Sequence, residues 1–468
     1  MAMSTRETAA AIAAHRFGLG EASLAGVGAD PQGWLMAQIG PADPARGENL
    51  PSTAQALVQV QAEAEARRMA KNAPAGTPAE VAATGGRYRE LILSDARSRL
   101  LTATTTQRPF AERLHLFWAN HFTVSLAKGA TRGLVGAFER DAIRPNIAGP
   151  FETMLTASST HPAMLRYLDN QQSAGPRSRI VGRLAKRAER LQEGARVTGL
   201  NENLAREILE LHTLGVNGGY SQADVTSFAA VLTGWRVARG DRAGDDSPFD
   251  PAWHEPGRKT VLGKSYPEGP DALGLLLRDL ARHPSTARFV STKLARHFVA
   301  DDPPPALVER LAQTWRRSDG QLAEVTRELV RSPDAWDAAP TKLKTPEEFA
   351  VSSARLLRLD ESLPERKGLA LLLAGGVNAL GQRLQTAPSP AGWPDRAEEW
   401  LGPEAVWKRI EWSARVGDRL GRFVDARALA EASLGPRLSD DTRTQIARAA
   451  DGPQALALLL MAPEFQRR

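Results

Sequence analysis

The sequence contains no cysteine among its 468 residues. Disulfide bridges, thiolate nucleophiles, iron–sulfur clusters and cysteine-based zinc sites are therefore excluded. Any metal site would need imidazole, carboxylate or amide ligands. The lack of cysteine fits a cytoplasmic protein, and it equally fits an exported protein that folds without disulfide bridges.

Long hydrophobic runs are also absent. The longest apolar stretch, ALALLLMA at 455–462, is far too short to cross a bilayer, so we expect no membrane span. The N-terminal stretch MAMSTRETAAAIAAHRFGLG lacks the apolar core and the cleavage signal of a secretory leader. On this basis alone we expect a cytoplasmic protein.

The excess of positive over negative side chains is small as well. The chain has 60 lysines and arginines against 54 acidic residues, a net charge of +6, and no nucleic-acid recognition motif accompanies it. We therefore expect no specific nucleic-acid partner. P-loop, GxGxxG, GxSxG and HExxH motifs are missing too. No motif dictates a reaction, so the sequence leaves open whether the protein is an enzyme.

What the sequence does contain is helical periodicity along most of its length. Capping signals support it, such as Ser221 with Asp224, and Thr345 followed by Pro346. We predict an all-α fold, a large multi-helical body with at most a small β-hairpin near 249–266. Apolar residues recur three or four positions apart in 86–104, 271–282, 285–299, 304–317, 320–331, 345–358, 403–415, 424–434 and 438–448.

We expect residues 1–468 to form one helical unit. If it divides, an N-terminal half, 1–240, carries the candidate polar site and a C-terminal half spans 265–468. The segment 172–199 is a basic insertion, which we interpret either as a mobile lid or contact surface or as a solvated, helix-forming insertion. Its basic residues are Arg177, Arg179, Arg183, Lys186, Arg187, Arg190 and Arg196.

The stretch NENLAREILELHTLG at 201–215 is the richest in side chains that can do chemistry. On a straight helix Asn203, Arg206, Glu207 and Glu210 share one face, and His212 lies about 140° from Glu207. Two carboxylates beside an arginine suit a general base with a charge partner, or a cation site. They equally suit an exposed face with an ordinary Arg206–Glu210 ion pair.

Histidines in two other segments are further candidates. His121, in LHLFWANHF, either faces a pocket or is a core histidine with a satisfied ring. His161 precedes a proline, and the helix that follows carries Asp169 and Asn170. Its position fits the start of that helix, and it also fits a group of polar side chains gathered at one end.

The non-helical region supplies two more candidates, His254 and Lys259, because a loop can deliver such residues to a cleft. None of the eight histidines forms an HExxH or HxxxH pair. No single helix therefore offers a chelating histidine pair at the usual spacing.

Several of these segments together resemble an uncharacterised bacterial family, catalogued as domain of unknown function 1800. The resemblance runs in order over almost the whole chain. It is carried by HRFGLG, LHLFWANHFTVS, HPAMLRYLDN, NENLAREILELHTLGVNGGYSQADV with VLTGW, HPSTARFVSTKLARHFVADDPPPALV, KTPEEF and PAGWP. Two features depart from the family pattern, Leu204 in place of a common tyrosine and the basic insertion 172–199.

The resemblance has implications for a site and for a partner. It implies that the polar residues of 201–212, with His121, His161, Asp169 and Asn170, line a shared site. Members of the family often look like partners of a second family, domain of unknown function 1501, which resembles exported sulfatase-like proteins with twin-arginine signals. By analogy the chain would be co-exported with such a companion, and would then be periplasmic.

Two hypotheses follow. In the first, which we favour because no arrangement dictates a reaction, the chain is a binding or assembly partner of an exported sulfatase-like companion, and 172–199 contacts it. In the second it is an enzyme with a histidine–carboxylate site in a helical cleft, working by proton transfer or with a divalent metal. The candidate catalytic residues are His121, His161, Glu207, Glu210 and His212; the candidate metal ligands are His121, His161, Glu207 and Glu210; substrate or network positions are Asn203, Arg206, Asp169, Asn170, His254 and Lys259.

Overall fold

The computed structural model describes residues 2–72, 79–191, 199–237, 249–337, 339–359 and 375–468. Within these ranges regular structure is almost entirely helical and the sheet is a two-stranded hairpin, so the predicted all-α class is confirmed. No helix in these ranges is long and apolar enough to cross a membrane.

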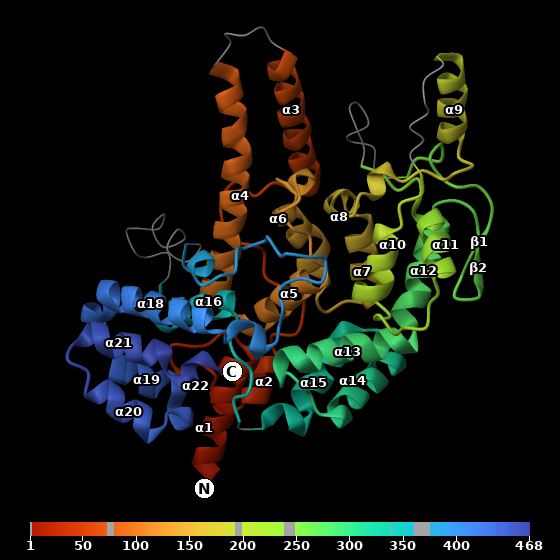
Figure 1. The fold of residues 1–468 in the computed structure, drawn as a ribbon. Coiled ribbons are helices and arrows are strands. Elements are labelled where there is room, and N and C mark those ends of the chain that lie inside the picture. The colour runs from red at the N-terminus through yellow and green to blue at the C-terminus, as the bar shows by residue number, and fades with distance from the viewer. Residues whose placement is uncertain (1, 73–78, 192–198, 238–248, 338, 360–374) are drawn as a thin grey trace.

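The N-terminal part of the chain is arranged around a buried helix, α5 (Pro109–His121), which begins at a proline, a residue favoured at the first helical position. Two long helices, α3 and α4, project together from the body (Figure 1). The other elements here are α1 (Ala2–Ile12), the π-helix η1 (Ala13–Phe17), α2 (Pro31–Met36), α3 (Thr53–Asn72), α4 (Ala79–Thr105), α6 (Val135–Phe138), the π-helix η4 (Glu139–Ile143), α7 (Phe151–Thr160) and α8 (Pro162–Tyr167).

The middle of the chain contains the polar stretch and the hairpin. The capping box predicted for Ser221 and Asp224 begins α11, with both hydrogen bonds present. The elements in order are α9 (Arg179–Leu191), α10 (Asn203–Glu207), the π-helix η7 (Ile208–His212), α11 (Gln222–Leu232), β1 (Lys259–Val261), β2 (Lys264–Tyr266), α12 (Asp271–Arg282), α13 (Pro284–Phe298), α14 (Pro305–Arg317) and α15 (Leu322–Arg331).

The C-terminal helices lie beside the N-terminal ones, although the two groups are far apart in the sequence (Figure 1). The helix start predicted at Thr345 and Pro346 begins α16, where Thr345 and Glu348 also form a capping box. The helices are α16 (Pro346–Leu356), α18 (Pro403–Leu420), α19 (Ala426–Leu434), α20 (Asp440–Ala447), α21 (Gly452–Met461) and α22 (Pro463–Gln466).

The buried apolar side chains of the described residues form two clusters. The first cluster runs from Ala10 to Ala335 and includes the inner faces of α5, α7, α11, α13 and α14. The second joins α16 and α18–α21 to Leu19, Leu100 and Ala103 from the N-terminal part. Because the first cluster contains residues from both 1–240 and 265–468, a subdivision between those halves stays a prediction.

The predicted hairpin is present at its predicted place. Lys259 pairs with Tyr266 and Val261 with Lys264, in antiparallel register. The two residues of the turn, Leu262 and Gly263, both have positive φ angles, 49° and 73°. That conformation matches the right-handed twist of the strands, and β1 packs on α11.

The basic insertion forms a helix, α9, that stands away from the body (Figure 1). Val181 is buried near its start, whereas the cationic side chains of the helix are exposed. Residues 192–198 of the insertion, with Arg196, lie outside the described residues. The exposed cationic residues are Arg179, Arg183, Lys186, Arg187 and Arg190.

Candidate functional site

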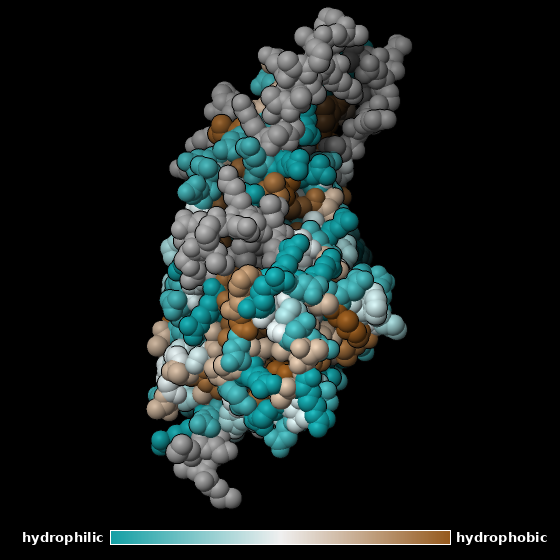
Figure 2. All heavy atoms as spheres, turned by 90° about the vertical axis from the view of Figure 1, so that its left-hand side faces the viewer, coloured by the Kyte–Doolittle hydropathy of each residue, from teal (hydrophilic) through white to brown (hydrophobic). Residues whose placement is uncertain are grey.

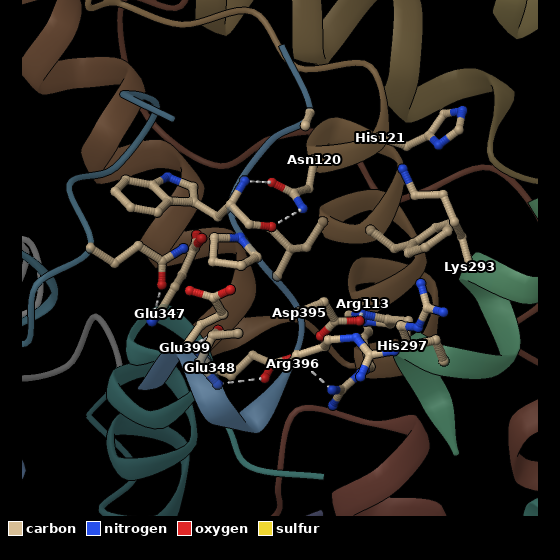
Figure 3. A pocket seen from close by; sticks show the side chains of 18 of the residues that line it. Arg113, Asn120, His121, Lys293, His297, Glu347, Glu348, Asp395, Arg396 and Glu399 are labelled. Carbon is tan, nitrogen blue, oxygen red and sulfur yellow. Dashed lines mark hydrogen bonds and ion pairs between the residues drawn. The ribbon is translucent and has the colours of Figure 1, made fainter. Parts of the chain in front are cut away.

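A cavity of about 290 Å³ lies between α5, α13, the first turn of α16 and the segment 391–399 (Figure 3). Phe117 in its wall belongs to the first apolar cluster, and the neighbouring Leu116 packs on the second. The cavity therefore lies where the two clusters meet. Junctions of this kind are common places for small-molecule sites.

The wall is built from segments that are far apart in the sequence. Asn120 and His121 come from LHLFWANHFTVS, Lys293 from the long motif at 283–308, Glu348 from KTPEEF, and Trp393 from PAGWP. These are four of the segments that carry the family resemblance. Their convergence on one cavity distinguishes it from the polar face of α10.

A buried carboxylate holds one side of the cavity together. Glu348 accepts hydrogen bonds from Arg113 (2.6 Å) and Arg468, and its carboxylate also accepts from the backbone of Thr345 at 2.9 Å. Burial alone would raise the pKa of Glu348, but the guanidinium groups of Arg468 and Arg113 hold that pKa well below its usual range. The carboxylate is therefore ionised and fully engaged.

A histidine–carboxylate pair lies beside it. The Nδ1 atom of His297 lies 3.1 Å from Oδ2 of Asp395. An ionised carboxylate only accepts, so Nδ1 carries the proton and Nε2, which has no hydrogen-bond partner among the described residues, holds a lone pair. Burial lowers the pKa of His297 to about 4 although Asp395 opposes the shift. The imidazole is thus neutral at pH 7.

Lys293 is a cation of the wall that the described residues leave without a partner. Its Nζ atom makes no hydrogen bond or ion pair with any of them, and it lies 5.7 Å from the centre of the Phe289 ring. Burial lowers the pKa of Lys293 to about 8; Asp395 opposes this shift and Arg296 adds to it. In Figure 3 the side chain extends from α13 toward His121.

Trp393 is fixed in the wall by an amide clamp. Asn120 donates from Nδ2 to the carbonyl of Trp393 (2.9 Å) and accepts at Oδ1 from its backbone amide (2.8 Å). Gly392 permits this approach, because a Cβ atom there would lie 2.5 Å from the Asn120 carbonyl oxygen. Its φ of +87° also favours glycine.

Two of the predicted catalytic histidines meet at one end of the cavity. His121 lines the cavity, its Nε2 atom lies 3.1 Å from the carbonyl oxygen of His212, and the two rings are 6.0 Å apart. Burial, and after it the charge of Lys293, lowers the pKa of both imidazoles, that of His212 to about 3. The buried Nδ1 of His121 and both ring nitrogens of His212 have no hydrogen-bond partner among the described residues.

His161 lies elsewhere and its ring is satisfied. Nδ1 accepts from the amide of Ala163 at 3.0 Å, so Nε2 carries the proton and donates to Oγ1 of Thr53 at 2.8 Å. The hydroxyl of Thr53 in turn donates to Asp141 at 2.5 Å. His161 therefore caps α8, and both its nitrogens are used in holding α3, α8 and η4 together.

The carboxylates of the stretch 201–215 form a half-exposed face. Arg206 is 3.1 Å from Glu202 and 3.9 Å from Glu210, and Asn203 is exposed. Burial and the nearby Glu210 raise the pKa of Glu207. Neither Glu207 nor Glu210 is among the charges that shift the pKa of His121, His161 or His212.

His212 belongs to the same stretch but is buried, unlike that half-exposed face. Residues 208–212 form a π-turn, which Thr213 stabilises by donating from its hydroxyl to the Ile208 carbonyl at 2.6 Å. The wider turn changes the angular spacing of a straight α-helix. It places the His212 ring 5.0 Å from the Phe122 ring, inside the first apolar cluster.

The other predicted positions have structural partners. Asp169 forms an ion pair with Lys128, and Asn170 donates to the carbonyls of Leu232 (3.1 Å) and Trp235 (2.9 Å). His254 pairs with the Thr233 carbonyl (2.7 Å) and with the ammonium of Lys259 (2.9 Å), so both side chains support the hairpin region. Neither lines the cavity.

The described ranges contain no group of three or more histidine, aspartate or glutamate side chains placed to hold one metal ion. The four residues predicted as metal ligands are therefore not assembled into such a group. Of these four, His121 alone lines the cavity. The metal-dependent form of the enzyme hypothesis stays a prediction.

Sequence reasoning missed most of the cavity wall. Lys293, His297, Glu348 and Asp395 were not candidates, because each looks like an ordinary charged residue of a helix or turn. A usable signal was present: the first three of these residues lie inside segments that carry the family resemblance, and Asp395 directly follows PAGWP.

Comparison with known proteins places the chain in a family but gives no individual relative. No curated protein and no solved structure matches the chain. A family model described as protein of unknown function (DUF1800) matches residues 12–467, which is nearly the entire sequence and includes every segment of the cavity wall. The chain therefore belongs to the DUF1800 family of proteins of unknown function.

Proposed function

We propose that the chain binds a small anionic molecule in the central cavity, at the end formed by Lys293 and Arg296. The observation that carries this proposal is a cation of the cavity wall, Lys293, with which no described carboxylate forms an ion pair. Desolvation of an unpaired ammonium is unfavourable, and a bound anion would remove that cost. The exposed carboxylate at the rim, Glu399, is not among the charges that shift the pKa of Lys293.

Apart from Arg296 and Glu399, the other charges of the wall are already paired. Arg99 lies 2.5 Å from Glu347 and Arg113 lies 2.6 Å from Glu348. Asp395 is the carboxylate whose charge raises the pKa of Lys293. It already interacts with His297, Lys342 and Arg468, and its distance to Lys342 is 3.5 Å. A bound anion would therefore supply the counter-ion that these residues do not give to Lys293.

The same groups support an enzyme rather than a passive receptor. An amine with a pKa of about 8 can exchange a proton near neutral pH. The neighbouring imidazoles, His121 and His297, are neutral and do not compete for the anion's charge. An acid–base reaction on a small anion is the form of the enzyme hypothesis that we carry forward.

A panel of ligands at constant ionic strength tests the proposal. Acetate, pyruvate, succinate and inorganic phosphate are compared with neutral sugars and with amines, by thermal shift and then by calorimetry. We expect at least one anion to stabilise the protein, and we expect Lys293→Met to abolish that effect. The matched control is Lys408→Met, a partly exposed helix lysine paired with Glu404, which should bind as the parent protein does.

Lys293→Met should also fold well. Because burial disfavours the charged amine, removing the charge should leave the unliganded protein as stable as the parent protein or slightly more stable. Binding of anions by a folded Lys293→Met protein with unchanged affinity would show that the proposal is wrong.

The assembly hypothesis is a second candidate, favoured by one observation. The five exposed cationic residues of α9, from Arg179 to Arg190, fall within an arc of about 100° on one face of the helix. Such a stripe suits an acidic protein surface, and an exported sulfatase-like companion of the domain of unknown function 1501 family is the partner we propose. Co-expression with that companion tests it.

The discriminating variant reverses Arg183, Lys186 and Arg190 to glutamate. Loss of the complex, with anion binding in the cavity unchanged, supports assembly through α9. A complex that survives this charge reversal removes α9 as the contact surface.

A further inference from the structure

We infer that the amine of Lys293 is a nucleophile that forms an imine with the carbonyl carbon of a small 2-oxo acid, while Arg296 holds the carboxylate of the same molecule. This inference deepens the proposed function and rests on it, because it needs an anion bound at the same end of the cavity. It adds a ligand class and a covalent step.

The spacing of the two residues on α13 is the geometric basis. Lys293 and Arg296 are three positions apart, so they are neighbours on one helix face and both line the cavity. In a 2-oxo acid the carbonyl carbon is bonded directly to the carboxylate carbon. Two side chains one turn apart can therefore reach the two groups of one molecule.

Arg296 is suited to holding the carboxylate. Its Nε atom donates to the carbonyl oxygen of Asp301 at 3.0 Å, which fixes the plane of the guanidinium group. Its two terminal nitrogens make no hydrogen bond within the described residues. A guanidinium group with a fixed plane and free donors can bind a carboxylate through two hydrogen bonds.

The amine of Lys293 is suited to attack. It has no carboxylate partner to keep it protonated, and the groups that act on it are Asp395 from the segment 391–399 and Arg296 from its own helix; it faces neutral His121 and His212. A pKa of about 8 leaves roughly a tenth of the amine unprotonated at pH 7. An ordinary lysine has about one part in 2,500 unprotonated.

The covalent step balances without another reactant. The Nζ lone pair attacks the carbonyl carbon, the C–N bond forms, and the π electrons of the carbonyl move to its oxygen, which takes one amine proton. The hydroxyl of this carbinolamine then leaves with the second amine proton as water, and the C=N bond forms. The position of the amine in the cavity wall favours the imine, because it limits the water that would reverse the step.

Reductive trapping with pyruvate tests the inference. The full-length protein is incubated with pyruvate and sodium cyanoborohydride, digested, and mapped by mass spectrometry. We expect Lys293 to carry at least about tenfold more label than any other lysine. Lys293→Met should show no site-selective label, and the surface control Lys408→Met should be labelled at Lys293 as the parent protein is.

A second variant tests the role of Arg296. Arg296→Gln should lower labelling of Lys293 by pyruvate at least about tenfold, yet leave labelling by neutral acetaldehyde unchanged, since only pyruvate has a carboxylate to hold. Equal losses with both reagents would show that Arg296 does not bind the carboxylate.

The imine and the anion site can fail separately. If pyruvate stabilises the protein through Lys293 but the label is absent from Lys293 or spread evenly over the lysines, the imine is overturned and the anion site stands. If the anion panel also gives no stabilisation that depends on Lys293, both the inference and the proposed function fall.

Discussion

The imidazole of His297 and the carboxylate of Asp395 meet at 3.1 Å although 98 positions separate them in the chain. The contact joins α13 to the segment that follows PAGWP. Asp395 also neutralises two fully buried cations, Lys342 and Arg468. One carboxylate therefore connects the first apolar cluster to the C-terminal part of the chain and shapes the cavity between them.

We expect Asp395→Asn to lower the free energy of unfolding by about 3–5 kcal/mol. Removing one partner of a buried ion pair leaves the others uncompensated in a medium that solvates charge poorly. Lys342 and Arg468 would then be only partly balanced, by Asp301 and Glu348. Urea denaturation of the parent protein and the variant at pH 7 measures the difference.

The control for this change is Asp302→Asn. Asp302 forms an ion pair of the same kind, 3.0 Å from Arg396, but its side chain is 85% exposed. Exposed pairs contribute at most about 1 kcal/mol. Equal losses for the two variants would contradict the role that we give to burial at Asp395.

We expect Gly392→Ala to destabilise the protein by about 2–5 kcal/mol and to weaken binding of anions. Its φ of +87° costs an alanine about 1–2 kcal/mol. The new methyl group would also meet the Asn120 carbonyl oxygen at 2.5 Å, and relieving such overpacking costs a further 1–3 kcal/mol or so. Trp393 would then shift in the cavity wall.

Gly381→Ala is the matched control, because Gly381 has a φ of +100° but its nearest neighbour for a new methyl group is Lys408 Nζ at 3.9 Å. It should lose only the backbone contribution and keep full ligand affinity. The thermal shift of each variant, with and without the stabilising anion, separates the two effects. Equal losses of stability and of ligand affinity in the two alanine variants would contradict the role that we give to the clamp between Asn120 and Trp393.

Local rules predicted the local structure well and the site poorly. Caps such as Ser221 with Asp224 depend on residues three apart, and the hairpin at 259–266 depends on a two-residue turn, so both are legible in the sequence. The cavity depends instead on charge compensation across long separations. Lys293 differs from a surface lysine because burial lowers its pKa and no described carboxylate pairs with it, and a linear sequence does not show either feature.

The polar face of α10 was predicted as a site, but it does not line the cavity. The stretch 201–212 was predicted to line a site because it is rich in polar side chains. A polar face on one helix, however, does not specify which residues pack against it. The π-turn at 208–212 also breaks the straight-helix geometry assumed for His212. Of the predicted catalytic residues, His121 alone lines the cavity.

We expect Glu207→Gln to change stability by less than about 1 kcal/mol, in the stabilising direction. Burial and Glu210 raise the pKa of Glu207, so the folded state disfavours its charge at pH 7. The group is only half-buried, so solvent screening reduces the gain. Calorimetry should show a rise in Tm of no more than about 2 °C and unchanged affinity for the anion. A large loss of affinity would return the functional site to α10.

We expect stability to fall as the pH drops from about 6.5 to about 4. Burial lowers the pKa of His161 and of His297 to about 4 and that of His212 to about 3. In the unfolded chain these rings take up protons near pH 6.5. Between the two values the unfolded state binds more protons, so the stabilising contribution of each neutral ring is complete above pH 6.5 and is lost as the pH falls.

The size of this effect is on the order of 3 kcal/mol for His161 and the same for His297 when the loss is complete, at about 1.4 kcal/mol per pKa unit. His161→Gln tests the assignment, because a glutamine does not titrate: its stability should depend less steeply on pH between 6.5 and 4 than that of the parent protein. Urea midpoints measured across this range give the slope. Parallel slopes for the two proteins would mean that His161 binds protons equally in the folded and unfolded states, so that burial does not lower its pKa.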